Sequence, residues 1–420
     1  MVNPSKKRLN ISTIQQKYLL KKLNIVSLEN LDTVVLKKLK EALKTVDDPR
    51  QKYKTHYKIW DIVICVIIAD FANIYDWNDI HDFVSEHYSW FRTFLQMTGG
   101  VPSSQTYERV FSLIDYKQLE EILNKFYLAI TYNHSNKTDT INIDGKVDKG
   151  SSRNQTDYHD KTKPLNSLNA YSNNLGICLA SEIIDDKTNE IPTIPTILKR
   201  LKIKDVIITW DALNTQKENI DAVVGGKAHY VVPIKGNQGN LFSELDLYFD
   251  EKRLETIIAG NTKSAYLKYH ENSHSSLITY EYFQTNDINW FHDKKEWNKL
   301  TTIGLVKKTI IKNGEVKIEK RYYISSLEIN IVDFSNAIRN HWSVENKLHW
   351  HLDFTFRQDY NTTMNKNALM NLQIVNKFCL AILNKVKPFY DNKSLRRIRN
   401  IMSYNFEKNF VDLLCYLVCS

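Results

Sequence analysis

Three carboxylates stand in short motifs where they could support divalent-metal chemistry. Asp144 ends the run I-N-I-D, Asp211 follows the apolar run I-I-T-W, and Glu345 lies in the helical stretch R-N-H-W-S-V-E-N-K-L-H-W-H-L-D. Taken singly, each has an ordinary structural explanation as a polar strand end, a helix cap or a surface charge. Together they fall at the ends of the first and fourth strands and on the last helix of one predicted sheet. The three carboxylates are therefore a candidate site for Mg²⁺ or Mn²⁺, which prefer oxygen ligands.

Such a site predicts phosphoryl transfer. Two divalent ions ~3.5–4 Å apart can activate an attacking oxygen and stabilise a leaving one. This chemistry needs no nucleophilic side chain, and the sequence contains no Ser-His-Asp or Cys-His arrangement. It also lacks the G-x-x-x-x-G-K-[ST] and G-x-G-x-x-G motifs, so no nucleotide cofactor is expected.

The histidines near Glu345 leave a second metal interpretation open. His349 and Asp353 are four residues apart, with His351 between them, and such a pair could bind zinc. Zinc sites need further His or Cys ligands, and none follows in a paired spacing. The alternative role for Trp342, His349 and Trp350 is to pack the helix onto the sheet.

The elements that must position these residues divide the chain into successive regions. A basic lead-in (1–30) precedes an all-α domain (31–135), in which Ile59–Ile74 is apolar nearly all round and predicts a buried central helix. Strands alternate with helices in 138–252, in the order of an RNase H-like α/β core. A β-rich insertion (253–328) contains Asn313-Gly314 between alternating apolar runs, which predicts a hairpin. The helix that carries Glu345 returns in 329–387, and a basic helical tail (388–420) ends the chain.

The charge distribution favours a polyanionic partner. The net charge is +9, and residues 1–60 alone hold fourteen Lys or Arg against five acidic residues. A solvated lysine-rich helix face is the alternative explanation. If the partner is DNA, the expected contacts are the residues near the carboxylates and in the second basic cluster: Lys146, Lys235, Asn237, Gln238, Arg339, His341, Lys347, Arg396 and Arg397.

The cysteines and apolar runs indicate a cytoplasmic protein. Its five cysteines are scattered and none forms C-x-x-C, as is typical of reduced thiols. The longest apolar run, Ile59–Ala72, is too short to span a bilayer, and no signal peptide is evident.

Ordered motifs between about Asp47 and Arg399 resemble the H-repeat-associated family of DDE insertion-sequence transposases. They are D-P-R at Asp48–Arg50, G-G-V-P-S leading into T-Y-E-R-V-F at Gly99–Phe111, I-D-G-K at Ile143–Lys146, D-K-T-N-E-I at Asp186–Ile191, T-W-D-A-L-N-T-Q at Thr209–Gln216, K-G-N-Q at Lys235–Gln238, Y-Y-I-S-S-L at Tyr322–Leu327 and H-W-S-V-E-N-K-L-H-W-H-L-D at His341–Asp353. The resemblance implies a helical associated domain, an RNase H-like core and a β insertion before the last catalytic helix. It also implies that Asp144, Asp211 and Glu345 form the metal-binding triad. The implied activity is Mg²⁺-dependent cleavage and transfer of DNA strands, on terminal repeats and target DNA, by two protomers.

Four family positions differ in this chain. Val147-Asp148-Lys149 stands where an arginine usually follows the first aspartate, and His274–Ile278 replaces H-G-R-x-E. Gln358-Asp359 replaces E-D, and Thr362 replaces a later arginine. These departures support an alternative, a decayed or repurposed DNA-binding protein without catalysis. A metal-dependent nuclease without strand transfer is a third possibility.

Overall fold

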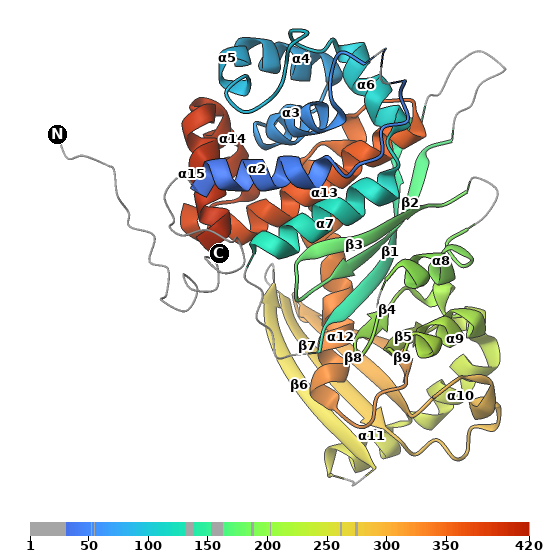
Figure 1. Cartoon of the computed structure of the whole chain (residues 1–420). Coiled ribbons are helices and arrows are strands. Elements are labelled where there is room, and N and C mark those ends of the chain that lie inside the picture. Colours follow the sequence, from blue (N-terminus) through green and yellow to red (C-terminus); the bar gives the residue numbers. More distant parts are fainter. Residues whose placement is uncertain are drawn as a thin grey trace, which may run out of the picture.

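The computed structural model describes residues 31–419 except 52, 54, 132–137, 153–162, 186–188, 202, 261–262 and 274–275. The basic lead-in, the first residues of D-K-T-N-E-I, and His274 and Ser275 of the altered insertion motif lie outside the described residues. The described chain is a mixed α/β structure with helices above and beside one long sheet (Figure 1).

That sheet has nine strands in the order β3-β2-β1-β4-β5-β9-β8-β7-β6. In the first half of the sheet, β2 pairs antiparallel with both β1 and β3. On the other side of β1, β4 pairs parallel with β1, and β5 pairs parallel with β4. The strands are β1 Thr140–Asp148, β2 Leu165–Ser172, β3 Ile177–Ile183, β4 Ile207–Thr209, β5 His229–Ile234, β6 Ser264–Ser273, β7 Ser276–Thr285, β8 Thr302–Lys312 and β9 Glu315–Ser325.

The predicted β-rich insertion continues this sheet. Strand β9 pairs antiparallel with β5, and β8, β7 and β6 follow outward. The β8–β9 hairpin turns at Asn313 and Gly314, which both have positive φ (51° and 84°). A turn with two positive φ angles matches the right-handed strand twist and favours Asn-Gly, so the hairpin prediction is confirmed.

Helices cover both faces of the sheet. One face packs on α8 Thr193–Arg200, α9 Lys217–Gly225, α10 Gly239–Tyr248 and α11 Glu251–Ile258, and the last of these was not predicted. The other face of the central strands packs on α12 Ile331–Val344 through Phe334, Ala337 and Ile338.

A helical layer forms the third core (Figure 1). Its central helix α3 buries almost every side chain, as its all-round apolar sequence predicts. The last helices, from the predicted tail, lie in the same core as the first ones; Phe406 and Phe410, for example, contact the ring of Trp90. The layer consists of α2 Leu31–Leu43, α3 Ile59–Phe71, α4 Trp77–Glu86, α5 Tyr88–Phe91, α6 Ser104–Leu113, α7 Tyr116–Ile130, α13 Lys366–Val386, α14 Leu395–Tyr404 and α15 Phe406–Cys419.

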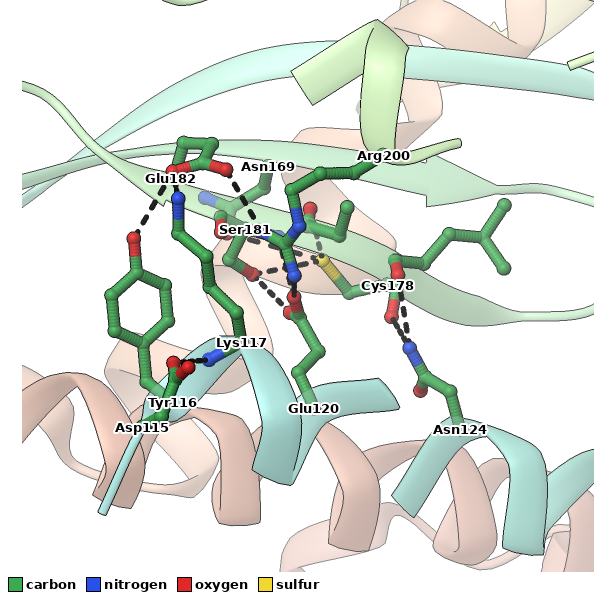
Figure 2. Close-up of polar contacts among 12 residues, drawn as sticks. Asp115, Tyr116, Lys117, Glu120, Asn124, Asn169, Cys178, Ser181, Glu182 and Arg200 are labelled. Atoms are coloured by element: carbon green, nitrogen blue, oxygen red, sulfur yellow. Dashed lines mark hydrogen bonds and ion pairs between the residues drawn. The ribbon is translucent and has the colours of Figure 1, made fainter. Parts of the chain in front are cut away.

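A buried polar network joins this layer to the sheet (Figure 2). The Glu120 carboxylate on α7 accepts hydrogen bonds from the backbone N–H and the hydroxyl of Ser181 on β3, at 2.8 and 2.6 Å. Arg200 on α8 pairs with Glu120 at 2.9 Å and with Glu182 at 3.1 Å. Because buried charges are tolerated when paired and hydrogen-bonded, this network fixes α7 and α8 against the edge strand.

Candidate metal centre

Asp144 and Asp211 lie at the same end of two neighbouring strands. Strands β1 and β4 pair in parallel, with Asn142 opposite Thr209. Asp144 lies two residues beyond Asn142 on β1, and Asp211 lies two residues beyond Thr209, just past the end of β4. Strand alternation buries Ile141 and Ile143 in the core with α8 and α9, which directs Asn142 and Asp144 to the opposite face. On that face Asn142 donates to the carbonyl of Asn340 on α12 at 2.9 Å.

The helix that carries Glu345 changes its winding at that residue. After α12 the backbone continues as two π-helical segments, Glu345–His349 and His351–Thr355. Short π segments inside helices are rare and often occur at functional sites. The sequence predicted that ordinary helical spacing continues from Arg339 through Glu345 and His349, and the periodicity of the apolar residues gave no sign of the π segments.

His349 connects the helix to the first strand. Its Nδ1 lies 3.4 Å from Asp144 Oδ2 and 3.5 Å from Glu345 Oε2. Each of these three residues offers an atom within 4.8 Å of the others, so they could share one cation. His349 Nε2 is buried, and the described residues provide it with no hydrogen-bond partner.

Asp211 is held by another residue of the helix. His341 Nε2 lies 3.3 Å from Asp211 Oδ1, and this hydrogen bond is the main reason that the pKa of Asp211 is lowered. Asp211 precedes a short 3-10 helix, Ala212–Asn214, but its side chain makes no capping bond. The Asp211 side chain therefore does not cap a helix but contacts His341 on α12.

Electrostatics at Asp144 indicate an accumulation of negative charge. Burial is the main factor that raises the pKa of Asp144 to about 7, and the carboxylates of Asp211, Glu190 and Glu345 raise it further against an opposing effect of His341. Burial also lowers the pKa of His349 to about 3, so its imidazole is neutral near pH 7. Crowded carboxylates beside a neutral imidazole fit a divalent cation, which requires deprotonated oxygen or nitrogen donors.

Glu190 is a site residue that sequence reasoning missed. Its Oε2 accepts a hydrogen bond from Asn214 at 2.7 Å, and its Oε1 lies so near Gly145 that a Cβ there would come within 2.0 Å of it. The side chain thus fills the space beside β1 because residue 145 has no side chain. Glu190 belongs to the D-K-T-N-E-I motif, which was the available signal.

The residues predicted to contact DNA are found in several environments. Lys146 is buried and forms an ion pair with Asp353, so its ammonium has little exposure to a phosphate. The same pair removes Asp353 from any zinc site with His349. Arg339 pairs with Glu271 at 2.5 Å and lies over the ring of Tyr269, toward the outer strands.

Asn237 and Gln238 support the loop after Asp211. Asn237 donates to the carbonyl of Ala212 at 3.0 Å, and Gln238 donates to that of Thr215. The neighbouring Lys235 is exposed, and its positive charge contributes to the low pKa of Asp211. Lys347 contacts Asn173 Oδ1 at 3.2 Å, while Arg396 and Arg397 are exposed on α14.

Two family models match most of the chain. Residues 40–127 match a model described as DDE_Tnp_1-associated, and residues 135–380 match one described as Transposase DDE domain. The chain belongs to the DDE transposase family. The H repeat-associated putative transposase YhhI of Escherichia coli K12 is 30% identical over 359 residues, which cover 84% of this chain and 92% of the relative. The putative transposase YncI of Escherichia coli O157:H7 is 29% identical over 84% of this chain and 88% of its own length.

Two further comparisons are more limited. A piggyBac transposase synaptic complex with hairpin DNA aligns at 11% identity with a TM-score of 0.34, too low to inform the fold of this DDE transposase. The inactive transposase YbfQ of Escherichia coli K12 is 34% identical over 18% of this chain. No helix in the described part of the chain combines the length and apolarity needed to cross a bilayer.

Proposed function

We propose that the chain is a DDE transposase that cleaves and transfers DNA strands at Asp144, Asp211 and Glu345. The observation that carries the proposal is the parallel register of β1 and β4, which aligns the two aspartates, together with the π segment that presents Glu345 beside Asp144. The strand order and directions of β1–β5 support an RNase H-like catalytic core.

In this proposal Asp144, Asp211 and Glu345 hold two Mg²⁺ or Mn²⁺ ions, and His349 completes or orients the donor set. Bound divalent ions supply charge stabilisation at the scissile phosphate and lower the pKa of an attacking water. The three carboxylates would bind the metal ions and orient them toward the phosphate. His341 keeps Asp211 ionised, and His349 fixes Asp144 against Glu345. The DNA partner is double-stranded terminal repeat and target DNA, with two protomers joining the ends.

The proposed DNA contacts follow from exposure near the site. Lys235 and Lys347 flank the carboxylates, and Arg396 and Arg397 extend the positive surface along α14. Asn237, Gln238 and His341 act through Asp211 and its loop, while Arg339 orients the outer strands through Glu271. Binding through such cations should weaken steeply as salt increases.

The test is nicking of a supercoiled plasmid that carries the gene's own flanking repeats, in Mg²⁺. Wild type is compared with Asp144→Asn, Asp211→Asn and Glu345→Gln, which preserve side-chain size. We expect all three variants to lose at least about 10³-fold in rate while they still bind the repeats, because each removes a charge that the site uses at the reacting phosphate. Binding without nicking by the wild type would instead support the decayed DNA-binding protein, and nicking without joining would support a simple nuclease.

A further inference from the structure

Two aromatic side chains are exposed on the π-helical part of the catalytic helix. Trp350 is 46% exposed and Phe354 is 51% exposed. Their rings are stacked, with centroids 4.8 Å apart and planes 22° apart. This placement corrects the expectation that Trp350 packs the helix onto the sheet.

The aromatic pair begins one helical turn from the candidate metal centre. The backbone N–H of Trp350 donates to the carbonyl of Glu345, the i to i+5 bond of a π turn. Trp350 also directly follows His349, whose imidazole contacts Asp144. Trp350 therefore lies on the same helical segment as two of the candidate metal ligands, next to one of them in sequence and bonded through its backbone to the other.

One arginine contacts this aromatic pair, and a second contacts an exposed ring further along the chain. The guanidinium of Arg396 on α14 lies 5.7 Å from the ring centre of Phe354, and Arg396 is exposed. Further along, the guanidinium of Arg357 lies 5.0 Å from the ring centre of Tyr360, which is 68% exposed. Alternating rings and guanidinium groups suit a chain of bases and phosphates.

A buried arginine supports this surface from below. Arg399, in the same basic cluster as Arg396, is fully buried and donates to the carbonyl of Thr355 at the end of the π segment. It also pairs with Asp70 of α3 at 2.8 Å. Because Arg399 ties α14 to both elements, the position of Arg396 relative to Phe354 is fixed by a buried contact.

We propose that Trp350, Phe354 and Arg396 form a stacking platform for an unpaired DNA base next to the cleaved phosphodiester. The proposal rests on the proposed function, since it takes the bound phosphate to be at Asp144 and Glu345. The ligand is an unpaired base because a paired base is already stacked on both sides within the duplex. Charge favours nucleic acid over a protein partner, since the rings are interleaved with exposed arginines. Stacking on an aromatic side chain contributes about 1–3 kcal/mol per base, or roughly 5–150-fold in affinity.

The test uses two DNA duplexes that carry the fluorescent base 2-aminopurine at the repeat end. The two duplexes differ only in whether this base is paired or unpaired. Binding is followed by anisotropy and stacking by 2-aminopurine quenching, without divalent metal so that no cleavage occurs. We expect the full-length wild type to prefer the unpaired end and to quench its fluorescence. Trp350→Ala should lose about 5–50-fold in affinity for the unpaired end and leave the paired duplex nearly unchanged, while Trp350→Phe should retain most of the preference.

Tyr404→Ala is the matched control, because Tyr404 is an 80% exposed aromatic residue elsewhere on α14. It should change neither affinity. The platform is overturned if the wild type shows no preference for the unpaired end, or if Trp350→Ala weakens both duplexes equally or neither of them. These outcomes are independent of nicking. A protein that prefers unpaired ends but never nicks retains the platform and loses the proposed function. A protein that nicks but shows no preference for unpaired ends loses the platform alone.

Discussion

His349 Nδ1 lies 3.4 Å from Asp144 Oδ2, so one imidazole joins the first strand to the π-helical segment. The same nitrogen lies 3.5 Å from Glu345 Oε2. Burial and the positive charges of Lys146 and Lys377 keep the pKa of His349 low, so the imidazole stays neutral and can face a cation. His349 thus sets the separation of two candidate metal ligands from different elements.

We expect His349→Ala to raise the Mg²⁺ concentration needed for half-maximal nicking by about 10–100-fold, the usual effect of losing a ligand-orienting partner. The measurement is a Mg²⁺ titration of the nicking rate at saturating DNA. His351→Ala is the control, because His351 contacts Thr355 Oγ1 of its own helix at 3.1 Å and not the carboxylates. Identical Mg²⁺ dependence in the two variants would contradict this role.

The close approach of Glu190 to Gly145 predicts non-additive substitutions. Gly145→Ala should displace the Glu190 carboxylate and break its bond to Asn214, at a cost of about 1 kcal/mol in the free energy of unfolding. In a Glu190→Ala background the same change should cost almost nothing, since the obstructing oxygens are gone. Denaturant unfolding of the four proteins measures this coupling, which should be about 1 kcal/mol. Simple additivity would show that the two side chains do not meet.

Features set by local backbone geometry could be predicted from the sequence. Strand alternation was enough to direct Asp144 away from Ile141 and Ile143, and Asn313-Gly314 was enough for a hairpin, because both depend on local backbone geometry. The D-K-T-N-E-I motif drew attention to Glu190, but its position against Gly145 depends on how two segments distant in the sequence pack together, which no local pattern shows.

Two other features depend on the tertiary fold. The outer strands join the central sheet through the pairing of β5 with β9, which no local pattern encodes. Arg396 and Arg399 look alike in sequence, yet one is exposed and the other fully buried against Asp70. Charge pattern alone cannot separate a DNA-facing arginine from a structural one.

Asp148 predicts a pH-dependent stability. Burial is the main factor that raises its pKa to about 6, and its Oδ2 accepts a hydrogen bond from Gln373 at 2.7 Å. The folded state therefore holds this proton more tightly than the unfolded chain does. Its contribution to stability is greatest below about pH 4 and is lost as the pH rises through about 6.

Asp148→Asn should keep the Gln373 bond and remove this titration. We expect the variant to match wild type near pH 4 and to be more stable by roughly 1–3 kcal/mol at pH 7.5. Urea unfolding between pH 4.5 and 7.5 provides the measurement. Parallel pH profiles for the two proteins would mean that Asp148 does not titrate in this range.

Arg399 and Asp70 predict a large stability effect away from the metal centre. Both side chains are almost fully buried, with the guanidinium over Phe356 at 4.1 Å and bonded to the carbonyl of Asp70 as well as to its carboxylate. Arg399→Ala leaves a buried carboxylate without its partner, so we expect a loss of about 3–5 kcal/mol. Asp70→Asn in the same chain should recover part of this loss, because the uncompensated charge is removed.

Arg397→Ala is the control for this prediction, since Arg397 is exposed two residues earlier on the same helix and should change stability by less than about 0.5 kcal/mol. Denaturant unfolding of the wild type and the three variants at pH 7.5 separates these effects. Equal, small losses for Arg397→Ala and Arg399→Ala would mean that the pair does not hold α14 against α3.

The π segment should also loosen when Arg399 is lost, because Arg399 caps the carbonyl of Thr355. Amide hydrogen exchange over residues 345–355 should then accelerate in Arg399→Ala and remain at the wild-type rate in Arg397→Ala.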